Sequence, residues 1–128
     1  MLKKIATHSG KFHADETLAV FMLKQLPEYA NAQIIRTRDP LELATCDIVV
    51  DVGAVYDHST GRYDHHQRSF NDTFSSDFAV KLSSAGLIYK HYGKQVLCRL
   101  LDWPESHPLL NVIYLKIYQE LILMVVID

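Results

Sequence analysis

The sequence has few of the features that mark secreted or membrane-spanning proteins. Its two cysteines, Cys46 and Cys98, are too few and too far apart to form a disulfide framework, so we expect two reduced thiols. No secretory or mitochondrial presequence pattern follows Met1, which favours a cytoplasmic or nuclear location. The apolar stretch LILMVVID at the end is far shorter than the roughly 20 residues that cross a bilayer. We therefore expect no membrane association.

The sequence also lacks an excess of charge of either sign. Thirteen Lys and Arg residues stand against 15 Asp and Glu residues, which gives a formal net charge of -2. No general electrostatic attraction then draws the chain to nucleic acid, and any phosphate group must be bound locally by a metal ion or a few placed cations. The chain does have 48% hydrophobic residues over 128 positions, enough for one domain with its own core across residues 1–128.

Strand and helix patterns alternate in the first half of the chain. A helix is predicted over Asp15 to Leu26, where Pro27 ends it. The continuous apolar run after Asp47 is typical of a strand buried on both faces of a parallel sheet. Residues 53–67 can form two short extended pieces around a turn. We therefore predict an α/β fold with a mostly parallel sheet flanked by helices and with strands over 3–7, 32–37 and 47–52.

Helical patterns occupy the second half. Ser83 or Ser84 can cap a helix that runs to about Tyr92 and ends at Gly93, and a further helix can begin at Val96. Residues 110 to about 125 are predicted to form a long, very apolar helix.

Three polar clusters follow three of the predicted strands or extended pieces. Because the carboxyl ends of parallel strands meet at one edge of a sheet, these clusters are expected to form one site. Histidine and carboxylate ligands together favour manganese, zinc or iron; Mn2+ fits, with Mg2+ as the alternative. Two such cations can activate water at a phosphoryl group, and Asp51 is the natural bridge between them. The clusters contain His8, His13, Asp15 and Glu16, then Asp51, then Asp64, His65 and His66.

Each cluster also has a simpler interpretation. His8 and His13 can lie at the surface or near a helix end, and Asp15 can favour the positive end of the helix. Asp51 can cap a turn. In an extended piece His65 and His66 point to opposite faces, so that only one of them would bind a metal directly.

Basic side chains near the clusters can contact substrate. Arg36 and Arg38 project to the same face of a predicted strand and could reach a substrate phosphate, although an ion pair with Asp39 or Glu42 is equally consistent with the sequence. We place the remaining histidines, at positions 58, 91 and 107, outside the site.

Four segments carry a resemblance to a known family. They are THSGKFHADE (7–16), VVDVG (49–53), RYDHHQRSF (62–70) and LSSAGLIYKHYGK (82–94). They closely resemble the melanocyte-proliferating-gene (Myg) family of exonucleases, a branch of the DHH phosphoesterase superfamily. The resemblance implies a Rossmann-like DHH domain, a two-metal phosphodiesterase site and 3′–5′ exonuclease action on RNA in the nucleus and mitochondrion.

The resemblance also implies roles for individual residues. Asp51 matches the bridging aspartate, and Asp64 would orient a ligand or bind metal itself. His66 would face the substrate phosphate and stabilise developing charge; Arg38, which the sequence rather than the resemblance suggests, could assist it. The metal ligands that the resemblance implies are His8, His13, Asp15, Asp51, Asp64 and His65.

The end of the chain departs from the family pattern. Family members continue through a helix with an acidic end into a second domain, whereas the residues from about 120 onward are apolar and leave only Asp128. We expect the second domain to be absent, and the sequence leaves open whether Asp128 completes the site and which oligomer forms. Two alternatives follow: a catalytically incomplete metal-binding fragment with an interaction role, or a small-molecule phosphohydrolase resembling a pyrophosphatase.

Overall fold

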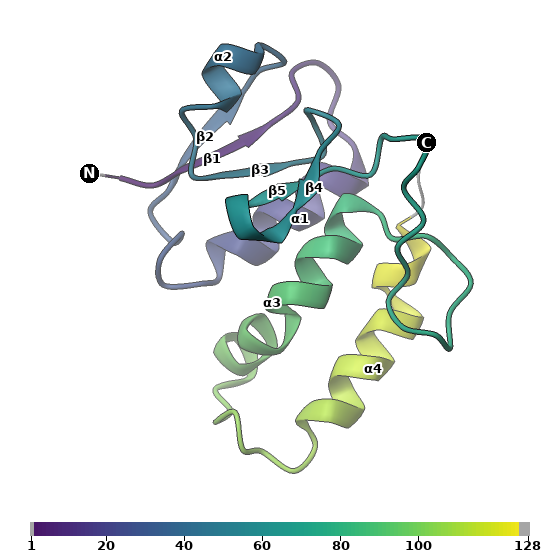
Figure 1. The fold of residues 1–128 in the computed structure, drawn as a ribbon. Helices are drawn as coiled ribbons and strands as arrows, with labels where there is room; N and C mark the ends of the chain where they lie inside the picture. Colours follow the sequence, from purple (N-terminus) through teal and green to yellow (C-terminus); the bar gives the residue numbers. More distant parts are fainter. Residues whose placement is uncertain (1, 126–128) are drawn as a thin grey trace.

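A five-stranded sheet forms the centre of the protein, as seen in a computed structural model that describes residues 2–125 (Figure 1). The strand order is β2-β1-β3-β5-β4, and only β4 runs antiparallel to its neighbour. The prediction of an α/β fold with a mostly parallel sheet is confirmed. The strands are β1 (Lys4–Thr7), β2 (Gln33–Arg36), β3 (Ile48–Val50), β4 (Tyr56–Asp57) and β5 (Arg62–Tyr63).

Helices connect the first three strands along the chain and cover both faces of the sheet. Helix α1 (Ala14–Lys24) joins β1 to β2, and the short α2 (Pro40–Leu43) joins β2 to β3. Ile48 and Val50 of β3 point into the larger core. Val49 between them packs on the opposite face, in a smaller cluster with Leu43 and Cys46. Both faces of β3 are thus buried, which explains its uninterrupted apolar sequence.

The second half of the chain forms a helical layer against α1 (Figure 1). Helix α3 (Ser84–Leu101) packs against α1 and against α4 (Leu110–Glu120). The predicted helix end at Gly93 is wrong, because α3 continues through this residue. A Cβ atom at Gly93 would lie 2.8 Å from Cε1 of Tyr114, so this glycine allows an α4 side chain to pack close to α3.

Helix α4 is shorter than its sequence predicts. At Leu121 the backbone leaves the helical region (φ -131°, ψ -61°), and a 3-10 turn follows over Ile122–Met124. Apolar side chains such as Val112 and Leu115 remain exposed on α4, so apolar composition here does not mean burial. Asp128 lies outside the described residues. Between residues 2 and 125 we find no helix with the length and apolar character needed to cross a membrane.

Candidate metal centre

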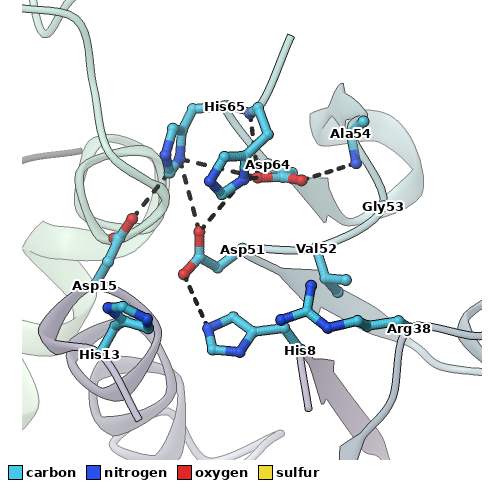
Figure 2. Close-up of a pocket in the computed structure, with 11 residues that line it drawn as sticks. His8, His13, Asp15, Arg38, Asp51, Val52, Gly53, Ala54, Asp64 and His65 are labelled. Carbon is cyan, nitrogen blue, oxygen red and sulfur yellow. Dashed lines mark hydrogen bonds and ion pairs between the residues drawn. The ribbon is translucent and has the colours of Figure 1, made fainter. Parts of the chain in front are cut away.

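A cavity of about 390 Å³ opens where β1, β3 and β5 end (Figure 2). Every site residue predicted from the sequence lines this cavity, except Arg36. The sheet therefore brings together side chains that are up to 58 positions apart in the chain, between His8 and His66. The lining residues are His8, His13, Asp15, Arg38, Asp51, Val52, Gly53, Ala54, Asp64, His65 and His66.

Asp51 lies at the centre of the cavity. It follows β3 directly and has a left-handed backbone conformation (φ 59°), which is uncommon for a non-glycine residue. Its Oδ2 lies 3.5 Å from Nε2 of His8, whereas its Oδ1 lies 3.8 Å from Nδ1 of His65 and of His66. The two oxygens of one buried carboxylate thus face different ligand groups.

The Asp64-His65-His66 segment forms the opposite wall. Asp64 Oδ2 accepts a 2.8 Å hydrogen bond from the backbone of Ala54, and its Oδ1 lies 2.6 Å from Nδ1 of His66. The expectation that the two histidines point to opposite faces is wrong. The backbone N–H of His66 also bonds Asp64 Oδ1, so the segment turns instead of extending and the two imidazole rings lie 4.1 Å apart.

Four of these side chains are close enough to share one metal ion. Asp51, Asp64, His65 and His66 each offer a ligand atom, and these atoms lie within 4.8 Å of one another. All but His66 are buried. Carboxylate oxygens with imidazole nitrogens suit a divalent transition metal such as Mn2+, so the donor set fits the expected cation.

Asp15 reaches the cavity from the first turn of α1. Its Oδ1 accepts a 2.7 Å hydrogen bond from the backbone N–H of Ala85, and its Oδ2 accepts one from Ser84 at 3.2 Å and lies 3.7 Å from Nδ1 of His65. The carboxylate therefore lies against the positive end of α3 and beside the histidine wall. Asp15 also lies in the first turn of its own helix, as the simpler interpretation expected, so it is close to the positive ends of both α1 and α3.

Ser84 is a site residue that the sequence analysis missed. Ser83 caps α3 by accepting a hydrogen bond from Gly86, which leaves Ser84 fully buried beside the cavity. Its hydroxyl lies 3.0 Å from Nδ1 of His65 and 3.3 Å from Oδ1 of Asp51. The signal in the sequence was the pair of serines, because a helix needs only one of them as its cap.

Glu16 belongs to the first predicted cluster but was not expected to be a site residue, and it explains the position of Arg36. This glutamate is almost completely buried; its Oε1 lies 3.8 Å from Nε2 of His8, and its Oε2 pairs with the Arg36 guanidinium at 3.1 Å. Arg36 also donates to the carbonyl of Gly10 and lies over the ring of Phe12. The predicted pairing of Arg36 with Asp39 or Glu42 is wrong, since Glu16 is its partner; its contact with substrate stays a prediction.

Arg38 differs from Arg36 in its surroundings. Strand β2 ends at Arg36, so the two arginines do not share a strand face as the sequence analysis expected. Arg38 donates to the carbonyl of Ser9 at 2.9 Å and lines the cavity.

Burial and like charge act together on the carboxylates. Burial raises the pKa of Asp15, and it raises the pKa of Asp51 to about 7 with a further contribution from the charges of Asp15 and Asp64, while His66 opposes the shift. Carboxylates this close together and this poorly solvated are stabilised by a bound proton or by a bound cation.

The other three histidines have contacts outside the cavity. His58 and His91 stack with their rings 3.9 Å apart, and His91 Nε2 lies 2.6 Å from the hydroxyl of Tyr56. His107 stacks on Trp103 at 3.6 Å. None of the three lines the metal cavity.

Comparison with known proteins gives the same family as the four sequence segments quoted above. The model of one family, MYG1_exonuc, described as "Uncharacterised protein family (UPF0160)", matches residues 4–127. The protein named MYG1 exonuclease from Mus musculus is 52% identical over 124 residues, which cover 93% of this chain and 33% of the relative. The MYG1 exonuclease of Homo sapiens gives the same identity and the same coverage.

A fungal relative gives a similar result. The MYG1 protein of Schizosaccharomyces pombe is 53% identical over 122 residues, which are 94% of this chain and 37% of that protein. The chain thus spans about a third of the length of the curated relatives that it matches. No solved structure matches the chain.

Proposed function

We propose, since this chain belongs to the MYG1 exonuclease family (UPF0160), that it carries a divalent-metal centre that hydrolyses phosphodiester bonds, as part of a 3′–5′ exonuclease acting on RNA. The exonuclease name of its mammalian relatives supports the reaction class. The observation that carries the proposal is the position of Asp51, whose two oxygens face His8 on one side and the His65 and His66 pair on the other. A carboxylate between two ligand groups is what a two-metal site requires.

In this proposal Asp51 would be a shared ligand of two cations, with Mn2+ preferred and Mg2+ as the alternative. One cation would bind Asp64 and His65, and the other would bind the first cluster, His8, His13 and Asp15. When bound, the two cations supply an activated water and neutralise charge on the phosphoryl group. Ser84 would orient His65 and Asp51 through the hydroxyl that lies between them.

His66 and Arg38 are proposed to bind the substrate phosphate. The Nδ1 of His66 is held by Asp64, while half of the His66 side chain is exposed, so its other ring nitrogen is available to a ligand in the cavity. Arg38 adds a permanent positive charge to a cavity that three aspartates also line. Together they would stabilise the charge that develops on the phosphoryl oxygens.

The finer points of the proposal extend beyond the site itself. One is that residues 1–128 form a Rossmann-like DHH domain, and another is that the protein acts on RNA in the nucleus or mitochondrion. The activity of the whole protein is also part of the proposal, because this chain corresponds to only about a third of the length of its relatives.

The test is hydrolysis by the purified chain with added Mn2+. A 5′-labelled oligoribonucleotide, pyrophosphate and bis-p-nitrophenyl phosphate would be compared as substrates for the wild type, Asp51→Asn and His65→Ala. We expect shortening of the RNA from its 3′ end by the wild type and loss of this activity in both variants. Asp102→Asn is the matched control, because Asp102 is an exposed residue at the far end of α3. Turnover of pyrophosphate alone would favour a small-molecule phosphohydrolase.

A second candidate function is a metal-binding module that docks to a partner through α4. The exposure of Leu109, Val112 and Leu115 along this helix favours it, because their exposed fractions are 51%, 58% and 43%. Metal binding without hydrolysis of any of the three substrates is the result that this candidate requires.

A further inference from the structure

A second hollow of about 340 Å³ adjoins the metal centre. Arg38, Val52 and Gly53 line both spaces, so the two are direct neighbours. In Figure 2 these three residues lie on the side of the metal centre away from Asp15. A ligand with one end in the metal centre can therefore extend past them into this hollow, which we call the apolar slot.

The walls of the apolar slot differ in chemistry from those of the metal cavity. Its apolar lining consists of Leu43 and Ala44 of the α2 segment together with Val49, Val52 and Val55. Within the described part of the chain no aspartate or glutamate lines the slot, whereas the metal cavity has three aspartates. The slot thus suits an uncharged, largely apolar group, and the metal cavity suits a phosphate with its cations.

Two arginines add positive charge to this apolar surface. Arg38 is at the boundary between the slot and the metal cavity. The guanidinium of Arg62 donates to the carbonyls of Thr60, Leu43 and Cys46, which fixes it in place at the slot. Because guanidinium N–H groups donate in the plane of the group, these bonds use its edge and leave its flat face for stacking.

We propose that the apolar slot binds the nucleobase of the nucleotide whose phosphate group lies in the metal centre. A base is flat and mostly apolar on its faces, it stacks on guanidinium planes, and in a nucleotide it is joined to a phosphate. Each of the two hollows lies near the lower end of the roughly 300–1,000 Å³ range of small-molecule sites, so one nucleotide can occupy both. This inference rests on the proposed function and names the part of the substrate that is recognised beside the reacting phosphate.

The test uses three p-nitrophenyl phosphodiesters that release the same product. They are thymidine 5′-(p-nitrophenyl phosphate), hexyl p-nitrophenyl phosphate and methyl p-nitrophenyl phosphate, hydrolysed by the whole 128-residue chain with Mn2+. We expect the wild type to have a KM for the thymidine ester about tenfold lower than for the methyl ester, because only the former can fill the slot.

The test variant is Ala44→Trp, which fills the slot from an exposed position at the end of α2. It should raise the KM for the thymidine ester to about that of the methyl ester, a change of about tenfold, with kcat/KM for the methyl ester unchanged. Leu41→Trp is the matched control: Leu41 is in the same helix, is 80% exposed and does not line the slot. The control should behave as the wild type.

Each other result overturns a defined part of this inference. Equal KM values for the thymidine and methyl esters, with no effect of Ala44→Trp, would leave the proposed function intact and remove the slot from it. A KM for the hexyl ester as low as that for the thymidine ester would show that the slot accepts any apolar group and would overturn the assignment to a nucleobase. No hydrolysis of any ester would overturn the proposed function, and the slot assignment with it.

Discussion

Asp15 in the first turn of α1 accepts a 2.7 Å hydrogen bond from the backbone N–H of Ala85 in the first turn of α3. A second bond from Ser84 to the same carboxylate makes Asp15 the link between two helices that pack against each other. Because the first N–H groups of a helix have no partner within the helix, this carboxylate satisfies two of them. The same side chain lies 3.7 Å from His65, so one residue takes part both in the contact between the helices and in the site.

We therefore expect Asp15→Ala to be less stable than Asp15→Asn by about 1–2 kcal/mol, because asparagine keeps an acceptor for one of the two N–H groups and alanine keeps none. The measurement is urea unfolding of the metal-free protein. Comparison of the two neutral variants removes the cost of the buried charge from the result. Glu105→Ala, at an exposed acidic residue, is the control and should match the wild type. Equal stability of the two Asp15 variants would mean that the capping bonds contribute nothing.

Gly93 gives a prediction about the packing of α3 against α4. Alanine favours a helix over glycine by about 1 kcal/mol, so Gly93→Ala would stabilise α3 if only the helix mattered. In the structure a Cβ atom here would lie 2.8 Å from atoms of both Tyr89 and Tyr114, whose rings stack 4.8 Å apart.

Since the aromatic rings must move, we expect Gly93→Ala to lower the free energy of unfolding by about 1–3 kcal/mol. Thermal or urea unfolding measures this change. Gln95→Ala, an exposed position two residues further along the same helix, is the control and should be close to neutral. A gain in stability for Gly93→Ala would show that the two helices are packed more loosely than the structure indicates.

The sequence predicted the polar edge of the sheet well, and the reason is physical. The apolar run of β3 is typical of a strand buried on both faces, and parallel strands place whatever follows them at one edge. Asp51 and the Asp64-His65-His66 segment both follow such strands, so their meeting could be expected from their order along the chain. The sequence pattern was enough to predict this meeting, because both the strands and the polar segments after them are recognised from local sequence.

What the sequence did not predict depends on contacts between distant segments. Gly93 looks like a helix end until the ring of Tyr114, 21 positions later, is seen to need its space. Glu16 looks like an ordinary acidic residue in a first helical turn, yet it is buried and pairs with Arg36 at the end of β2. In the same way, nothing local shows that Ser84 rather than Ser83 faces the site.

Metal binding gives the most direct prediction for the site. Asp51→Asn replaces a charged oxygen between His8 and His65 with a neutral amide, so we expect its affinity for Mn2+ to fall by more than about tenfold. Isothermal titration with MnCl2 measures this affinity. Asp102→Asn makes the same chemical change at an exposed residue and should leave the affinity unchanged. If both variants bind Mn2+ as the wild type does, Asp51 is not a ligand.

The raised pKa of Asp51 predicts how the stability of the metal-free protein changes with pH. The pKa is 3.8 in the unfolded chain and about 7 in the folded one, chiefly because of burial. Between these values the folded protein holds a proton that the unfolded chain has released. The stabilising contribution is therefore complete below about pH 4 and is lost as the pH rises through about 7, with a slope of at most roughly 1.4 kcal/mol per pH unit.

Asp51→Asn cannot lose a proton, so it should lack this part of the pH dependence. With EDTA present, the difference in unfolding free energy between variant and wild type should grow in favour of the variant between about pH 4 and pH 7 and then become constant. Urea unfolding across this range measures the difference. Mn2+ should reverse the order above about pH 7, because the ionised carboxylate of the wild type then has a cation to bind. A difference that does not change with pH would mean that Asp51 ionises in the folded protein much as it does in the unfolded chain, and that its neighbours do not oppose its charge.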